Sequence, residues 1–386
     1  GNDNLSGGDG NDSFAMGANY STSDTISGGA GTDTLTVTNT GAITAGTTTG
    51  VETITATVDT DTDTLALAKV SGLTTLTAAS GTDASTLNVT GLNSGATVVL
   101  SDADVDTATI DTAAAATLTI DTQIALGGAI TVTDAASVTV QNTGSAAGDL
   151  NALALDTVDT TSLTLNAGTN GGVDVGAVTL TDNVATLTVT GQTTGQDAVM
   201  DTMVDADALT SLTLTANGGD ATIGTIGVSG TAAGNAELLA AITATASNTG
   251  TVTLTNVYAD DSTNSTTDLA MTVTGTAGTN STIAFGTIVN TYGTIALTTS
   301  GLGTVGSTAL TADDITGTIS AIGTHAAMTA TDDITLTVSN AGAVVLSALS
   351  AGAAATGAIT VTATGAGALT ISDVNASAGA LTVTGT

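Results

Sequence analysis

The sequence alternates apolar residues with threonine along most of its length, and this alternation constrains the fold more than any other feature. A period of two places successive side chains on opposite faces of an extended strand, so that one face of each segment would be buried. Threonine is a good strand former and would keep the outer face polar without adding charge. Clusters of Gly, Asn, Asp and Ala, which are typical turn residues, separate the segments. The alternation occurs at Leu35–Val37, Leu118–Ile120, Ile130–Val132, Val138–Val140, Leu163–Leu165, Leu187–Val189, Leu212–Leu214, Val252–Leu254, Leu336–Val338, Ile359–Val361 and Leu381–Val383.

The spacing of these segments predicts how the strands are connected. Leu187 and Leu212 are 25 residues apart. Leu336 and Ile359 are 23 apart, and the next segment follows 22 residues later. A period in the low twenties that holds two or three short strands is typical of one coil of a β-solenoid. We therefore expect an all-β chain with an elongated β-solenoid. The alternative is a string of small β-sandwich domains, with a period of about 90–100 residues and more buried aromatic residues.

Two stretches depart from the alternation and predict short helices at the corners of coils. Residues 197–209 carry apolar residues at helical spacing, and residues 235–242 begin with an N-cap residue followed by helix formers. The polar segment 259–268 predicts a protruding loop. The residues at helical spacing in the first stretch are Val199, Met200, Met203 and Val204.

The first 36 residues contain a second, shorter repeat. Residues 7–15 read Gly-Gly-Asp-Gly-Asn-Asp-Ser-Phe-Ala, and residues 28–36 read Gly-Gly-Ala-Gly-Thr-Asp-Thr-Leu-Thr. Both fit the calcium-binding nonapeptide G-G-x-G-x-D-x-U-x, in which U is a large apolar residue. Its glycine-rich turn offers carbonyl and carboxylate oxygens, the ligands that calcium prefers, and U would point inward from a short strand. Residues 1–6 and 24–27 match partial copies, so we expect the chain to begin inside a repeat and to be a fragment of a longer protein.

These copies predict a parallel β-roll in which copies two apart stack and share calcium. Such stacking pairs Asp12 with Asp33, and Asp3 with Asp24. A plain turn without metal is the alternative for any single copy, and a second full copy argues against it. The turn before Asp24 lacks the glycines, which weakens that pairing. The predicted metal-binding residues of the roll are Asp3, Gly7, Gly8, Asp9, Gly10, Asp12, Asp24, Gly28, Gly29, Gly31 and Asp33.

Two runs of alternating aspartates are further candidate calcium ligands. Both resemble the start of an EF-hand loop, but Thr64 and Val70 in one run, and Thr107 and Ala113 in the other, replace its glycine and final glutamate. Alternate strand positions still place carboxylates on one side, about 7 Å apart. They would repel one another unless a cation lay among them; the alternative is a solvated acidic edge. These aspartates are Asp59, Asp61, Asp63, Asp102, Asp104 and Asp106, and weaker candidates are the pairs Asp260–Asp261, Asp313–Asp314 and Asp332–Asp333.

Charge and composition exclude several classes of function. The chain has 386 residues and a net charge of −34, with one basic residue, Lys69, so we expect no binding to nucleic acid and no direct membrane insertion. It has no Cys and one His, His325, so neither a zinc site nor a Cys–His catalytic pair can form within it. Gly301–Gly306 fits G-x-G-x-x-G, but a strand-like segment follows where dinucleotide binding needs a helix. Aromatic residues are 1% of the chain, too few for the sugar platforms of a glycosidase, so we predict no enzymatic activity.

The nonapeptides, the segments Thr34–Val37 and Gly50–Ile54, and the long Thr/Ala/Gly/Val-rich remainder together resemble the RTX-type, calcium-dependent surface-layer (S-layer) proteins of Gram-negative bacteria. The specific motifs cover residues 1–36, and the remainder is similar in composition and strand rhythm. The resemblance implies type I secretion, folding in extracellular calcium, and self-assembly on the bacterial cell surface. Cell-surface polysaccharide would be a partner through regions outside this chain.

We therefore expect a calcium-binding RTX β-roll over residues 1–36 and a β-solenoid over residues 37–386, with a further division near 195–245 as an alternative. The expected function is that of an extracellular structural protein that binds calcium and self-assembles into a lattice or filament. Two other functions stay open: a surface adhesin whose stalk is the solenoid, and the carrier region of a type I secreted RTX enzyme. A dedicated binding tip would favour the adhesin, and a catalytic domain before residue 1 would favour the carrier.

Overall fold

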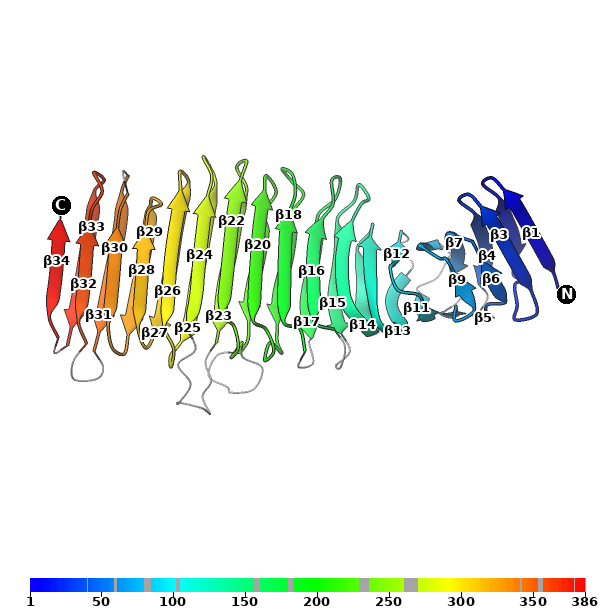
Figure 1. Cartoon of the computed structure of the whole chain (residues 1–386), viewed down its shortest axis with the longest axis horizontal. Coiled ribbons are helices and arrows are strands. Elements are labelled where there is room, and N and C mark those ends of the chain that lie inside the picture. Colours follow the sequence, from blue (N-terminus) through cyan, green and yellow to red (C-terminus); the bar gives the residue numbers. More distant parts are fainter. Residues whose placement is uncertain are drawn as a thin grey trace. The chain divides into compact units, whose positions relative to one another are not determined.

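The computed structural model describes residues 1–39, 41–58, 61–79, 85–101, 105–155, 160–179, 183–228, 236–259, 270–340, 342–352, 357–377 and 379–385. These residues form parallel strands stacked as a β-solenoid of about 15 turns, with no helix among them (Figure 1). This confirms the predicted fold class. The described residues also contain no helix that could cross a membrane. The chain divides into two compact units, residues 1–183 and 184–386, which we describe separately.

Three columns of parallel strands build the first unit. The first column is β1 (Asn4–Asp9), β3 (Thr25–Ala30), β6 (Thr47–Thr49) and β9 (Val70–Ser71). The second is β2 (Ser13–Gly17), β4 (Thr34–Asn39), β7 (Thr53–Val58), β10 (Thr75–Ala79), β12 (Ala96–Leu100), the later parts of β13 (Val105–Thr122) and β14 (Leu126–Asn142), and β16 (Ser162–Ala167). The third is β5 (Ala42–Thr44), β8 (Thr62–Ala66), β11 (Ser85–Leu92), the earlier parts of β13 and β14, β15 (Gly148–Leu155) and β17 (Val173–Thr179).

The apolar position of each nonapeptide points into the first unit, as predicted. Phe14 pairs in register with Leu35, and both are buried. Leu5 of the first partial copy pairs in the same way with Ile26 of the degenerate copy. Burial of these stacked side chains stabilises the coils by about 25 cal/mol for each Å² of apolar surface removed from water.

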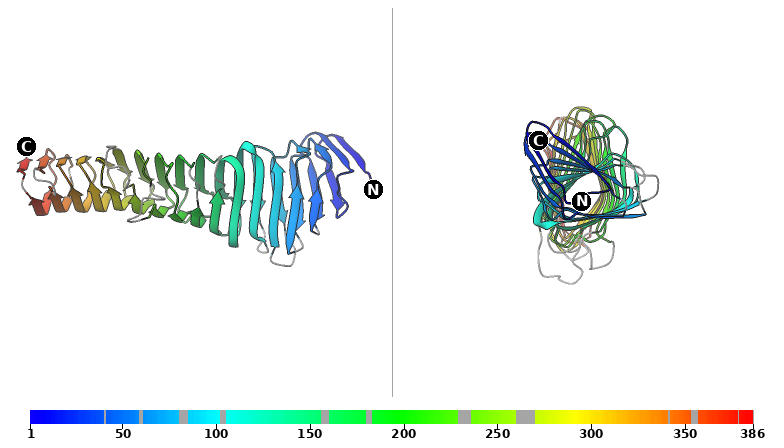
Figure 2. Two further views of the ribbon diagram at one scale, coloured as in Figure 1. Left: turned by 90° about the horizontal axis from the view of Figure 1, so that it is seen from below. Right: turned by 90° about the vertical axis from the view of Figure 1, so that its right-hand side faces the viewer.

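Two columns of parallel strands build the second unit, and Figure 2 shows the stacked coils from two further sides. We name them the even and the odd column after the strand numbers. The even column is β18 (Thr186–Gly191), β20 (Ser211–Asn217), β22 (Ala241–Ser247), β24 (Met271–Ala277), β26 (Ile295–Gly301), β28 (Ile315–Ile319), β30 (Ile334–Val338), β32 (Ile359–Ala363) and β34 (Leu381–Gly385). The odd column is β19 (Ala198–Met203), β21 (Ala221–Ile226), β23 (Thr251–Tyr258), β25 (Thr282–Asn290), β27 (Thr304–Ala312), β29 (Gly323–Ala330), β31 (Val344–Ala351) and β33 (Leu369–Ala376).

The register of the even column follows the predicted repeat only in part. Leu187 pairs with Leu212, as the spacing of 25 residues predicts. Ile359, however, pairs with Ile334 and not with Leu336, so the predicted register there was wrong by two residues. A shift of two keeps the same face inward, and alternation alone therefore could not fix it.

The prediction of a helix over residues 197–209 was wrong. Residues Ala198–Met203 form β19, in which Met200 and Met203 are both buried. The two residues between them face outward, so an extra residue in the strand places apolar side chains three positions apart. Val204, which a helix would have buried, is 46% exposed.

The second predicted helix, at residues 235–242, is also not formed by its described residues. Residues 236–240 are irregular and contain a turn, and β22 begins at Ala241. Leu239 is buried by this turn while Leu238 is 51% exposed, so the apolar run serves the corner of a coil. Most of the predicted loop over residues 259–268 lies outside the described residues.

Candidate metal site

The structure stacks the two complete nonapeptide turns on one another. The pairing of β1 with β3 aligns Gly8 with Gly29, one coil apart. The backbone N–H of Asp12 donates to Oδ1 of Asp33 at 2.7 Å. The N–H of Thr34 donates back to the carbonyl oxygen of Asp12 at 2.9 Å. The predicted neighbours Asp12 and Asp33 are therefore brought together, in a ladder that runs along the corner of the coils.

Each of these two carboxylates keeps one oxygen that the protein does not use. Oδ2 of Asp12 and Oδ2 of Asp33 are buried and have no hydrogen-bond partner, and Asp33 as a whole is fully buried. A buried carboxylate oxygen without a partner is costly unless a cation or a donor compensates it. These are the atoms of the corner that have ligand capacity to spare.

Backbone carbonyl oxygens lie beside the free carboxylate oxygens. A Cβ placed on Gly7 would collide with Oδ2 of Asp12 and lie 2.6 Å from the carbonyl oxygen of Gly28. A Cβ on Gly28 would collide with Oδ2 of Asp33 and with the carbonyl oxygen of Gly50. Carboxylate and carbonyl oxygens are the hard ligands that calcium takes in proteins. The residues present therefore fit a calcium ion, and the glycines leave these oxygens the space they occupy.

The second predicted pair, Asp3 and Asp24, stacks in the same way but uses its oxygens differently. The N–H of Asp3 donates to Oδ1 of Asp24 at 2.8 Å. Oδ2 of Asp24 accepts from the N–H of Ser21 at 2.8 Å and from its hydroxyl at 3.1 Å. The N–H of Asp3 is the main reason why the pKa of Asp24 lies below its ordinary value. This carboxylate is thus already satisfied by the chain, at the turn where the nonapeptide glycines are missing.

The remaining predicted ligands lie apart. Asp9 is exposed in β1, and Asp61 is exposed before β8. Asp63 is fully buried, and its Oδ1 accepts the N–H of Gly41 at 2.9 Å. Asp106 is half-buried in β13. Asp59, Asp102 and Asp104 lie outside the described residues. Nowhere in the part of the chain that is described do three or more His, Cys, Asp or Glu side chains converge on a metal position.

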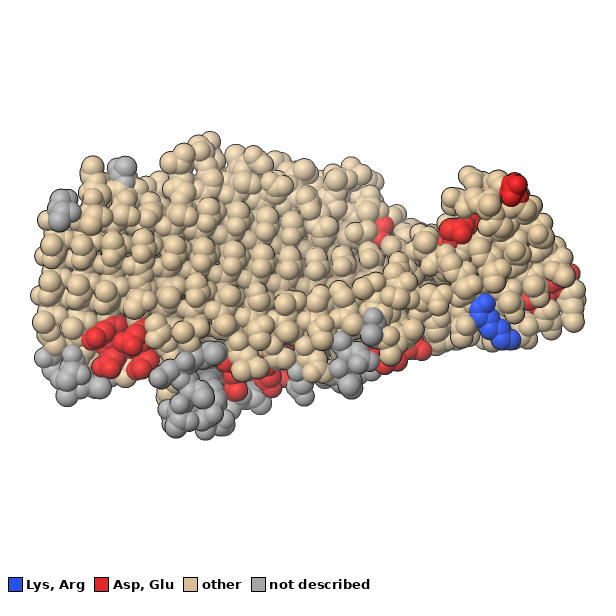
Figure 3. Space-filling model, viewed as in Figure 1, with Lys and Arg blue, Asp and Glu red and all other residues tan. Residues whose placement is uncertain are grey.

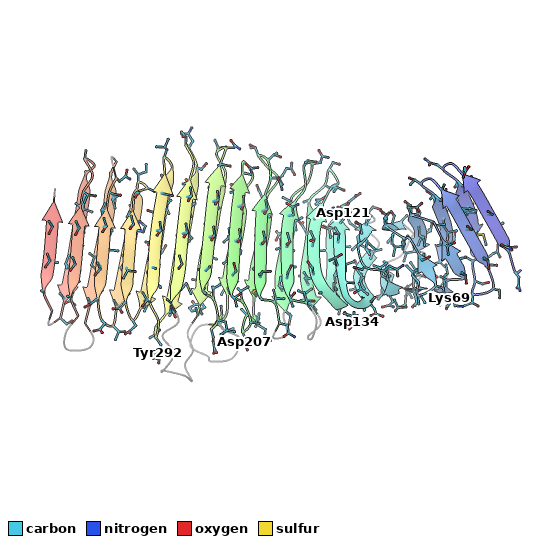
Figure 4. The ribbon with its side chains drawn as sticks, in the orientation of Figure 1. Lys69, Asp121, Asp134, Asp207 and Tyr292 are labelled. Carbon is cyan, nitrogen blue, oxygen red and sulfur yellow. The ribbon has the colours of Figure 1, made fainter. Side chains whose placement is uncertain are left out.

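Other corner aspartates also cap the N–H groups of neighbouring coils, which the sequence reasoning missed. Oδ1 of Asp197 accepts the N–H of Asp220 at 2.8 Å, and Oδ1 of Asp220 accepts the N–H of Thr251 at 2.7 Å. Of the weaker candidate pairs, Asp314 and Asp333 do the same, and Asp260–Asp261 lies outside the described residues. Asp121, labelled in Figure 4, accepts both the N–H and the hydroxyl of Thr143. Aspartate recurring once per coil was the signal for this role.

Glu52 is a second residue that the sequence reasoning missed. Its Oε2 accepts the N–H of Asp33 at 2.8 Å, in the position that Asp33 itself takes toward Asp12. No nonapeptide surrounds Glu52, and the motif search therefore passed over it.

A serine–histidine pair lies in the core of the second unit. Oγ of Ser307 and Nδ1 of His325 are 2.9 Å apart, and Nε2 of His325 is buried without a hydrogen bond. The register places this pair between Phe285 and Leu346 in an otherwise apolar inward row. Burial lowers the pKa of His325 to about 4. The ring is fully buried and has no route to a substrate, so the pair is part of the core.

Comparisons of the chain with protein-family models, with curated proteins and with solved structures found no match.

Proposed function

We propose that this chain is part of an extracellular structural protein that binds calcium at its N-terminal turns and self-assembles on a bacterial cell surface. The observation that carries the proposal is the pair of buried carboxylate oxygens on Asp12 and Asp33 that no group of the protein satisfies. They lie at stacked turns of a calcium-binding nonapeptide, beside backbone carbonyl oxygens. A calcium ion would compensate their charge and join successive coils.

The outer face of the even column supports the assembly part of the proposal. None of its strands contains Asp, Glu, Lys or Arg, although the net charge of the chain is −34. The face drawn in Figure 3 accordingly shows acidic residues at its margins. One row of outward threonines crosses every even strand in register, and none of these side chains is buried. A flat face without charge can approach a second copy without like-charge repulsion. The row is Thr188, Thr213, Thr243, Thr274, Thr298, Thr318, Thr337, Thr362 and Thr384.

The test of the calcium part is thermal unfolding, followed by circular dichroism, in calcium and in chelator. A ligand that binds only the folded state at a hundred times its Kd stabilises it by about 2.7 kcal/mol. We expect chelation to lower the Tm of the wild-type chain, and Asp12→Asn to reduce this difference. Asp149→Asn, at an exposed position of β15, is the matched control and should behave like wild type. An equal Tm with and without calcium would overturn the proposal.

A further inference from the structure

The ladder of carboxylates continues beyond the second nonapeptide. The pairing of β3 with β6 aligns Ser27 with Thr49, and the pairing of β4 with β7 aligns Thr34 with Thr53. The turn at 50–52 therefore stacks on the turn at 28–33, although it has three residues where the other has six. The sequence Gly50-Val51-Glu52 does not fit the nonapeptide.

The stacked turns at 28–33 and 50–52 repeat the oxygen arrangement of the two complete nonapeptides. At the first junction, Oδ2 of Asp12 and the carbonyl oxygen of Gly28 adjoin the same point beside Gly7. At the next junction, Oδ2 of Asp33 and the carbonyl oxygen of Gly50 adjoin the corresponding point beside Gly28. Oδ2 of Asp33 is buried and unpaired. The chemistry that supports calcium between the first two turns is therefore present one coil further on.

Charge strengthens the comparison. Asp12, Asp33 and Glu52 occupy successive coils, and strands of neighbouring coils are about 4.8 Å apart, so their carboxylates repel one another in the bare chain. The one basic residue of the chain, Lys69, is exposed and is labelled in Figure 4. Glutamate is one methylene longer than aspartate, which lets a carboxylate on the shorter turn still reach the N–H of Asp33.

We propose that a second calcium position lies between the turns at 28–33 and 50–52, with Asp33, Glu52 and the carbonyl oxygen of Gly50 among its ligands. The inference rests on the proposed function, because it assumes that the nonapeptide turns bind calcium. It also places the end of the series. In the following coil Thr74 stacks on Glu52, donating its N–H and hydroxyl to the carbonyl oxygen of Glu52, and it offers no carboxylate.

The test is the number of calcium ions bound per chain, measured by titration calorimetry on the full chain. Glu52→Gln removes the charge but keeps an oxygen that can accept the N–H of Asp33. Glu237→Gln is the matched control, since Glu52 and Glu237 are the two glutamates of the chain. We expect the stoichiometry to fall by one in Glu52→Gln and to stay at the wild-type value in Glu237→Gln.

The outcomes separate this inference from the proposed function. If Asp12→Asn lowers the stoichiometry and Glu52→Gln does not, calcium binding stands and the second position is overturned. If the wild-type chain binds no calcium, both fail. If Glu52→Gln does not fold, crystals of the wild-type chain soaked in terbium decide: an anomalous peak between Asp33 and Glu52 supports the position, and a peak between Asp12 and Asp33 alone overturns it.

Discussion

At the scale of single residues, the second oxygen of a corner aspartate decides what that aspartate can do. Asp24 gives one oxygen to a neighbouring coil and the other to its own turn, so its carboxylate is complete. Asp33 gives one oxygen to a neighbouring coil and leaves the other buried and unpaired. The glycines of the nonapeptide create this difference, because they leave no room for a turn residue whose side chain could satisfy the second oxygen.

We expect Gly29→Ala to destabilise the first unit far more than Gly8→Ala. Both glycines have left-handed backbone angles, with φ of 112° and 100°, so alanine costs about 1–2 kcal/mol of backbone strain at either position. A Cβ on Gly29 would also collide with the carbonyl oxygen of Gly8, whereas a Cβ on Gly8 meets no atom within 4 Å. Overpacking of this kind adds about 1–3 kcal/mol. Chemical denaturation of the two variants measures the difference, and equal losses would contradict the stacking of the turns.

We expect acid to destabilise the second unit through His325. Its pKa of about 4 in the folded chain lies below the ordinary value of 6.5, so the unfolded chain takes up the proton first as the pH falls. Stability is therefore complete above about pH 6.5 and decreases toward pH 4, by about 3 kcal/mol at most, since each pKa unit is worth 1.36 kcal/mol.

The measurement for His325 is the free energy of unfolding between pH 7 and pH 4. His325→Leu should lose the part of the pH dependence that comes from the ring, because leucine is the in-register residue of the next coil, Leu346. Ser307→Ala keeps the ring and should keep the pH dependence. Identical pH profiles for wild type and His325→Leu would show that the acid response comes from the carboxylates alone.

At the scale of secondary-structure elements, the odd column shows where a simple alternation rule fails. In β19, β21, β23 and β25, two inward residues are separated by two outward ones, so apolar residues fall three apart as in a helix. The same irregularity is in register from strand to strand: Met200 pairs with Ile223, and Met203 with Ile226. A single sequence segment cannot distinguish this from a helical turn, but the repetition in successive coils does.

We expect Met203→Ala to destabilise the second unit by about 2–5 kcal/mol, the usual cost of truncating a fully buried methionine. Val204→Ala should change stability by about 0.5 kcal/mol or less, because Val204 is 46% exposed. A helix over residues 197–209 would instead bury both side chains. Urea denaturation of the two variants separates these outcomes, and comparable losses would contradict the strand.

Much of the fold, and half of the candidate site, could be predicted from the sequence. Apolar–threonine alternation with a period in the low twenties predicted parallel coils because it reports directly on burial. The nonapeptides predicted the contact of Asp12 with Asp33 because their spacing fixes the length of one coil. The position of Glu52 could not be predicted, since it depends on a shortened turn that keeps its register only through the strands on either side.

At the scale of the whole molecule, the separation of charge from the flat faces is the main feature. The 35 acidic residues include none on the strands of the even column, and many lie at the corners, where carboxylates bind N–H groups of adjacent coils. Net charge of this size keeps molecules apart in solution. The exposed rows of uncharged threonine are therefore the surfaces on which copies could meet once divalent cations screen the corners.

We expect a lysine on the even column to abolish assembly, and a lysine on the odd column to leave it intact. Thr298 of β26 and Thr308 of β27 are both exposed, on consecutive strands of opposite columns, so Thr298→Lys and Thr308→Lys add the same charge to different faces. In a face-to-face contact between copies the Thr298→Lys side chain would bury a charge without a partner, which costs several kcal/mol per contact. Light scattering and electron microscopy in millimolar calcium should therefore show sheets or filaments for wild type and Thr308→Lys, and dispersed molecules for Thr298→Lys. Equal assembly of the two variants would place the contact elsewhere. A wild-type chain that stays monomeric at every calcium concentration would replace the structural function with that of an adhesin stalk or a secretion carrier.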